Sequence, residues 1–150
     1  MELKPKAVFD YFAEINKVPR PSKHEEKMIA YLKDFAEKNS LAFKTDEAGN
    51  VLIAKPAAPG MEGRPTVVLQ GHMDMVCEKR SDRVIDFEND PIETFIDGEW
   101  MRAKGTTLGA DDGIGGALAM AILTDSTIKH GPIECLFTRD EETGLTGAFA

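Results

Sequence analysis

Residues 66–74 read TVVLQGHMD, a short apolar run that ends in a histidine and an aspartate. Such a run, without polar alternation, is typical of a strand buried on both faces of a sheet. The stretch IECLFT at 133–138 has the same character. Between the two runs, residues 113–123 are rich in alanine, leucine and isoleucine and predict a buried helix. A strand, a helix and a second strand in this order favour parallel pairing through a right-handed crossover.

The flanking segments extend this pattern on both sides. Ser22 followed by Glu25 three residues later is typical of a capping box at a helix start. The further predicted elements are helices over 5–18, 23–38 and 144–150, strands at 41–44 and 51–54, and a hairpin over 92–103 that turns at Asp97-Gly98. We predict a three-layer α/β fold, in which helices flank a mixed, mostly parallel sheet.

Composition excludes some classes of function. The 150 residues include 18 Lys and Arg against 26 Asp and Glu, a formal net charge of −8. This balance argues against a nucleic-acid partner, because phosphate binding requires clustered cations. No apolar stretch approaches the roughly 18 residues of a membrane span, so no membrane partner is expected. The two cysteines, Cys77 and Cys135, form no disulfide framework, which favours a cytoplasmic protein with reduced thiols.

Three acidic clusters lie beside the central predicted elements: 71–74, 108–113 and 140–142. Two of them follow predicted strands and one precedes the predicted buried helix. Ligands of open α/β sheets bind outside the carboxyl ends of the strands, so we expect the three clusters to converge. Several carboxylates at one place repel each other unless a cation lies among them. The sequence therefore indicates a divalent metal site.

The spacing within the clusters suggests a division of roles. His72 and Asp74 are two residues apart on an extended segment, so their side chains point the same way. His72 could bind a metal while Asp74 accepts its other ring N–H. Glu141 and Glu142 are adjacent, which favours one as a ligand and the other as a base facing the substrate. Imidazole and carboxylate ligands suit zinc or a similar ion.

Each cluster has an ordinary structural interpretation when it is taken alone. Asp111 and Asp112 could cap the following helix, and residues 140–142 could form a solvated acidic turn. Cys77 is interpreted as a thiol that is neither a metal ligand nor a nucleophile. The glycines at 113–116 lack the Lys-Ser/Thr pair that a phosphate-binding loop needs. The metal interpretation depends on the three clusters occurring together and in this order.

That order resembles the di-zinc exopeptidase superfamily. Three longer stretches are similar to the aminoacyl-histidine dipeptidases (Xaa-His dipeptidase, peptidase D) within it: QGHMDMVCEK at 70–79, KGTTLGADDGIGG at 104–116 and DEETGLTGA at 140–148. The resemblance implies a role for each matching residue. The implied roles are ligand of one zinc for His72, orientation of that histidine for Asp74, a carboxylate bridging both metals for Asp111, general base for Glu141, and ligand of the second metal for Glu142. It also implies a cis peptide bond after Asp111.

The function implied by the resemblance is hydrolysis of dipeptides, carnosine-like Xaa-His dipeptides included, through a water shared by two zinc ions, with cobalt or manganese as other possible ions. Two alternatives stay open: an N-acyl amino acid deacylase or other aminopeptidase of the superfamily, and a non-catalytic module. The superfamily also uses a later aspartate, a distant histidine and a lid or dimerisation domain that match nothing here. We therefore expect residues 1–150 to be the N-terminal portion of a single metallopeptidase catalytic domain, inactive by itself. The longer enzyme is expected to act on a small peptide, with a homodimer among its expected assemblies.

Overall fold

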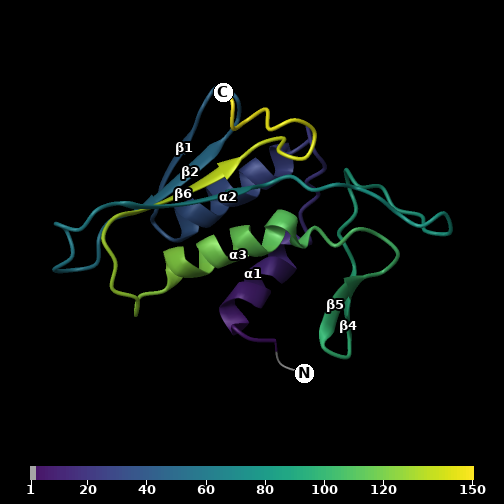
Figure 1. The fold of residues 1–150 in the computed structure, drawn as a ribbon, viewed down its shortest axis with the longest axis horizontal. Helices are drawn as coiled ribbons and strands as arrows, with labels where there is room; N and C mark the ends of the chain where they lie inside the picture. Colours follow the sequence, from purple (N-terminus) through teal and green to yellow (C-terminus); the bar gives the residue numbers. More distant parts are fainter. Residues whose placement is uncertain (1–2) are drawn as a thin grey trace.

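A computed structural model describes residues 3–150 of the chain. Its elements in chain order are α1 (Lys6–Ile15), α2 (Glu26–Lys38), β1 (Ala42–Thr45), β2 (Val51–Lys55), β3 (Val67–His72), β4 (Thr94–Asp97), β5 (Trp100–Ala103), α3 (Ala110–Thr124) and β6 (Ile133–Thr138). The main sheet has the strand order β1-β2-β6-β3, and β4 pairs with β5 alone. Figure 1 shows the β4–β5 hairpin standing apart from the main sheet, with α1 and α3 side by side.

The two apolar strands pair as predicted. β3 runs parallel to β6, in a register that starts at Val67 opposite Ile133 and ends at His72 opposite Thr138. Helix α3 lies between them in the chain, so the predicted parallel pairing with an intervening helix is confirmed. The sheet is mixed, as predicted, but two of its three pairings, β1–β2 and β2–β6, are antiparallel. The expectation of a mostly parallel sheet therefore does not hold for these four strands.

The helices share one face of the sheet. Alternate residues of β2 and β6 (Val51, Ile53, Ile133, Cys135 and Phe137) are buried in one core with the buried residues of α1, α2 and α3. The residues between them on each strand are half-buried. Residues 3–150 therefore form two of the three predicted layers, and burial on both strand faces is not observed.

Strand β3 lies at the edge of the sheet. Val67 and Val68 are 51% and 55% exposed, so the expectation that this run is buried on both faces is wrong. An apolar run indicates that a segment is a strand, but the burial of that strand depends on what covers it.

Within the described residues no helix is both long and apolar enough to cross a membrane.

Several local features differ from the predicted ones. Helix α1 ends at Ile15 rather than at residue 18. In the hairpin, Asp97 pairs with Trp100, so the turn residues are Gly98 and Glu99, and Gly98 takes the left-handed conformation (φ 61°). Residues 144–150 form turns instead of a helix.

Candidate metal centre

The side chains of the three acidic clusters meet beyond the carboxyl ends of β3 and β6. The Nε2 atom of His72 lies 2.9 Å from Oδ1 of Asp111 and 3.8 Å from Oε2 of Glu141. One ligand atom each from His72, Glu141 and Glu142 all lie within 4.8 Å of one another. The structure thus brings together the four residues that the sequence suggested as ligands or base, because the parallel register ends both strands at the same level.

Asp74 lies behind His72, as the two-residue spacing predicts. Its side chain is fully buried, and Oδ1 is 3.2 Å from Nδ1 of His72. Burial opposes ionisation of Asp74, but hydrogen bonds, first from His72, hold its pKa well below the usual range. An ionised carboxylate only accepts, so Nδ1 of His72 carries a hydrogen. Nε2 is thereby the nitrogen that faces the other acidic side chains.

The charge on His72 responds to the carboxylates around it. Burial lowers its basicity, but hydrogen bonds to Asp74 and Asp111 outweigh this and raise its pKa to about 9. At neutral pH the imidazole therefore holds a proton at Nε2, the atom that points to Asp111. Metal binding exchanges a proton for a cation at such a position.

Asp74 also holds the acidic loop after β6. The backbone N–H of Glu141 donates to Oδ1 of Asp74 (3.0 Å), and that of Glu142 donates to Oδ2 (3.2 Å). The Ser22 hydroxyl donates to Oδ2 at 2.7 Å. One buried carboxylate therefore fixes both the imidazole and the backbone of the two glutamates.

Asp111 and Asp112 have different surroundings at the start of α3. Asp112 accepts a hydrogen bond from the backbone N–H of His72 (3.3 Å) and lies between Gly71 and Gly115. A Cβ atom at either glycine would come within 2.2 Å of the Asp112 carboxylate. The Asp111–Asp112 peptide bond is cis, as the resemblance implies. Asp112 therefore connects the helix to β3, while Asp111 faces His72.

The cluster opens into a cavity of about 690 Å³, whose lining includes His72, Asp111 and Glu141. Glu142 is half-buried beside it, and burial together with repulsion from Asp111 and Glu141 raises the pKa of its carboxyl. A cation among these groups would relieve that repulsion. One imidazole with several carboxylate oxygens is a donor set that zinc and similar divalent ions accept. The residues present therefore fit a divalent metal.

A buried arginine lies beneath the cluster and was not predicted from the sequence. Arg20 is 2% exposed, and its guanidinium donates to the carbonyls of Met73 (3.3 Å), Asp74 (3.1 Å) and Gly109 (2.6 Å). Burial lowers its pKa to about 10, so it keeps its charge at neutral pH. A Cβ atom at Gly109 would lie 2.5 Å from this guanidinium, which explains a residue without a side chain there. Nothing in the local sequence marks an arginine between two prolines as buried.

Ser22 and Glu25 do not form the predicted capping box. Helix α2 begins at Glu26, and the residue before it makes no side-chain cap hydrogen bond. Ser22 instead donates to Asp74, and Glu25 accepts from Nε of Arg139 (2.6 Å) and the backbone N–H of Asp140 (3.1 Å). Both side chains turn away from the helix because loops distant in the sequence offer them partners.

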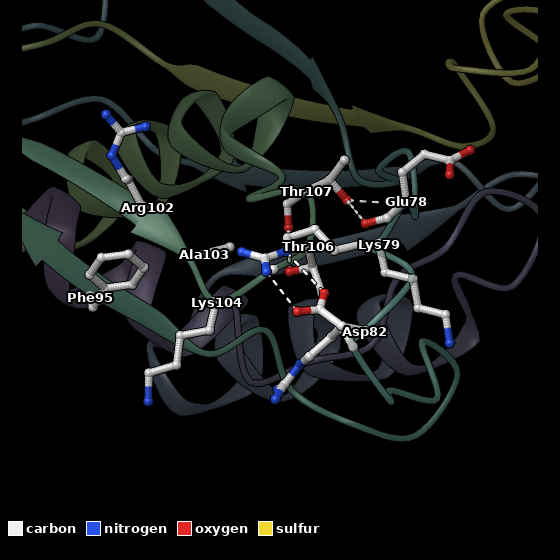
Figure 2. Close-up of a pocket in the computed structure, with 12 residues that line it drawn as sticks. Glu78, Lys79, Asp82, Phe95, Arg102, Ala103, Lys104, Thr106 and Thr107 are labelled. Carbon is white, nitrogen blue, oxygen red and sulfur yellow. Dashed lines mark hydrogen bonds and ion pairs between the residues drawn. The ribbon is translucent and has the colours of Figure 1, made fainter.

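A larger hollow, of about 810 Å³, lies at the base of the β4–β5 hairpin (Figure 2). Its lining within residues 3–150 includes none of the predicted site residues. Its charges largely pair: Arg80 binds Asp82 through two contacts, at 3.0 and 2.6 Å, and Arg102 lies 2.8 Å from Asp97. We therefore take the smaller cavity, where several carboxylates converge, as the candidate metal site.

Comparison with known proteins identifies the family. Residues 68–150 match the group described as peptidase family M20/M25/M40. The chain belongs to this family. The cytosol non-specific dipeptidase of Escherichia coli is 51% identical to this M20 chain over 148 residues, which cover 99% of the chain and 30% of that relative.

Two solved structures share the fold. The aminoacylhistidine dipeptidase of Vibrio alginolyticus is 52% identical with a TM-score of 0.96, over 99% of this chain and 30% of that protein. A tripeptidase of Staphylococcus aureus has a TM-score of 0.77 at 22% identity, over 99% of this chain and 40% of that protein, which shows the fold alone. The M20 chain thus spans 30% of the length of both dipeptidases. The resemblance to the aminoacyl-histidine dipeptidases and the mixed α/β fold are confirmed.

Proposed function

We propose that this M20 chain contributes the core of a metal-dependent dipeptidase site. The observation that carries the proposal is the convergence of His72, Asp111, Glu141 and Glu142 at the ends of β3 and β6. Asp74 supports this convergence from behind, through His72 and the backbone of the glutamates. The names of the two dipeptidases that are about half identical to this chain support the same reaction class.

The proposed roles follow from what each atom faces. His72 Nε2, Asp111 and Glu142 would supply ligands for two divalent ions, zinc or, in its place, cobalt or manganese. When bound, such ions polarise the scissile carbonyl and lower the pKa of the attacking water. Asp74 keeps the hydrogen on Nδ1 of His72. Glu141, whose Oε2 lies 3.8 Å from His72 Nε2, accepts the proton of that water and returns it to the leaving amine.

The finer aspects of the proposal concern the whole protein. Xaa-His dipeptides, carnosine-like ones included, are the proposed substrates, and the cytoplasm is the proposed compartment. We also propose that residues 1–150 are the N-terminal portion of one catalytic domain, inactive until a later aspartate and histidine complete the ligand sets. The 30% coverage of both dipeptidases supports this division. A homodimer is the proposed assembly of the longer enzyme.

The test distinguishes the proposed roles of Glu141 and Glu142. Zinc content after dialysis and Ala-His hydrolysis are both measured on a protein that extends the chain with the remaining ligands. Glu141→Gln should keep its metal and lose about 100- to 10,000-fold in turnover, because an amide cannot accept the proton of the water. Glu142→Gln should lose metal instead. Glu47→Gln, a matched change at an exposed residue, should alter neither.

Two results would count against the proposal. If Glu141→Gln loses metal while Glu142→Gln retains it, the two roles are reversed. If the extended protein cleaves N-acetyl amino acids and leaves Ala-His and β-Ala-His intact, the site belongs to a deacylase rather than a dipeptidase.

A further inference from the structure

Glu25 is a fully buried carboxylate at the end of the α1–α2 connection, outside the proposed ligand set. Its Oε1 atom accepts hydrogen bonds from the backbone N–H groups of Lys23 (2.8 Å) and Asp140 (3.1 Å). Its Oε2 atom accepts one from Nε of Arg139 at 2.6 Å. A buried carboxylate is costly unless such partners satisfy it, so this arrangement is specific to the loop that it contacts.

The loop contacted by Glu25 carries the two glutamates of the metal centre. Three successive backbone N–H groups in it donate to two buried carboxylates. The N–H of Asp140 donates to Glu25, and those of Glu141 and Glu142 donate to the two oxygens of Asp74. Glu25 and Asp74 come from different segments, so together they fix both the position and the direction of the strand-to-loop transition.

The side chain of Arg139 holds the same strand-to-loop transition in place. Besides Nε on Glu25, its Nη2 atom donates to the carbonyl of Lys23 (3.0 Å) and to Glu26 (2.8 Å). The hydrogen bond to Glu25 raises the pKa of Arg139, so the guanidinium stays charged. The next residue, Asp140, has a left-handed backbone (φ 50°), a conformation that is uncommon for residues other than glycine. Removal of Glu25 would leave this backbone without one of its anchors.

We propose that Glu25 is a positioning residue for the acidic loop: by holding the Asp140 amide and Arg139, it sets where Glu141 and Glu142 present their carboxylates. The proposal rests on the proposed function only in what it assigns to those two glutamates. Glu25 touches neither metal nor substrate, and it acts through the backbone of the loop.

The experiment compares Glu25→Gln with Glu26→Gln by backbone amide hydrogen exchange of the metal-free chain. Both variants lose one negative partner of Arg139, but Glu26 is exposed and makes no contact with the Asp140 amide. We expect the amides of residues 140–142 to exchange about 10- to 100-fold faster in Glu25→Gln, relative to the buried amide of Cys135. In Glu26→Gln they should stay within about twofold of the wild type.

Glu25→Asp provides a second test, which remains valid even if Glu25→Gln does not fold. It keeps the negative charge but is one methylene too short to reach both Arg139 and Asp140. Loosening of residues 140–142 in Glu25→Asp supports positioning by geometry. Wild-type exchange in this variant, or equal acceleration of Cys135 and the loop, overturns the proposal.

Zinc titration of the same variants, made in a protein that extends the chain with the remaining ligands, connects the loop to the site. The apparent zinc Kd should rise about tenfold in Glu25→Gln and less than twofold in Glu26→Gln. An unchanged zinc affinity in a variant whose loop amides have loosened overturns the positioning role. If the wild-type protein, extended with the remaining ligands, binds no zinc, the proposed function fails, while the exchange comparison still decides whether Glu25 positions the loop.

Discussion

Asp74→Asn removes one of the two oxygens through which a buried side chain accepts four hydrogen bonds. The donors are the Ser22 hydroxyl (2.7 Å), the Glu141 N–H (3.0 Å), Nδ1 of His72 (3.2 Å) and the Glu142 N–H (3.2 Å). Each oxygen accepts two of them. The side-chain NH₂ of asparagine cannot accept, so at least one backbone donor loses its partner, whichever way the amide is oriented.

The size of the loss follows from these contacts. A hydrogen bond to a charged group contributes roughly 1.5–3 kcal/mol, and the substitution removes one or two of them, since the Ser22 hydroxyl can rotate. The variant should therefore lose roughly 2–5 kcal/mol of unfolding free energy. Neutralisation also relieves repulsion from Glu25 and Asp140, whose carboxylates lie within 4.8 Å of it. The lowered pKa of Asp74 shows that attraction to its donors outweighs this repulsion.

Urea unfolding of the metal-free chain, followed by circular dichroism, measures this loss. Fluorescence is a poor probe, because the single tryptophan, Trp100, is 68% exposed on the hairpin. Asp34→Asn, the same change at an exposed helix position, should alter the unfolding free energy by less than about 0.5 kcal/mol. A loss below about 1 kcal/mol for Asp74→Asn would refute the view that this carboxylate holds the centre together.

Three further predictions concern residues around the centre. Arg20→Met should lower the unfolding free energy by roughly 3 kcal/mol or more in urea, because three carbonyls lose a charged donor; a smaller effect than that of an exposed arginine would contradict its bracing role. Gly115→Ala should lower the unfolding free energy by about 1–3 kcal/mol, since its Cβ would come 2.2 Å from Asp112. Gly116→Ala, whose Cβ would have its nearest neighbours at 3.7 Å, should raise the unfolding free energy by up to about 1 kcal/mol. Equal effects of the two variants in thermal unfolding would contradict this view of the packing. Burial raises the pKa of the Cys135 thiol to about 11 in the folded chain. The contribution of the neutral thiol to the unfolding free energy is therefore complete below its unfolded-state pKa of about 9, and it is lost as the pH rises through 11. Cys135→Ala should reduce this decline in unfolding free energy, and an unchanged slope would contradict it.

The sequence predicts those features that depend on short-range pattern and chain topology. The runs at 66–70 and 133–138 are strands, and the intervening helix makes their pairing parallel. Once the pairing is parallel, both strand ends lie at one edge, so the convergence of His72 with Glu141 follows from the order of the clusters. These conclusions require no knowledge of which side chains touch.

The residues that brace the centre could not be found in this way. Ser22 and Glu25 have the spacing of a capping box, and the local interpretation is physically sound. Their actual partners lie 52 and 114 or 115 residues away, where Asp74, Arg139 and Asp140 offer stronger hydrogen bonds. Local preference loses to tertiary contacts that a single sequence does not display. The burial of β3 failed for a related reason, because it depends on neighbours rather than on the strand itself.

Among residues 3–150, two groups of three acidic or imidazole side chains lie close enough to hold a cation, and hydrogen bonding distinguishes them. The first group is Glu25, Asp74 and Asp140; the second is His72, Glu141 and Glu142. In the first, every carboxylate oxygen accepts at least one hydrogen bond: those of Asp140, for example, accept from the hydroxyls of Thr143 (2.5 Å) and Thr146 (2.7 Å). A cation there would have to displace donors that hold three loops in place, and burial would make that loss costly. In the second group, burial raises the pKa of Glu142, and repulsion from Asp111 and Glu141 raises it further. We therefore expect a divalent ion to stabilise the second group and to disrupt the first, so that the buried carboxylates act as the frame of the proposed centre and the more exposed ones face the ion.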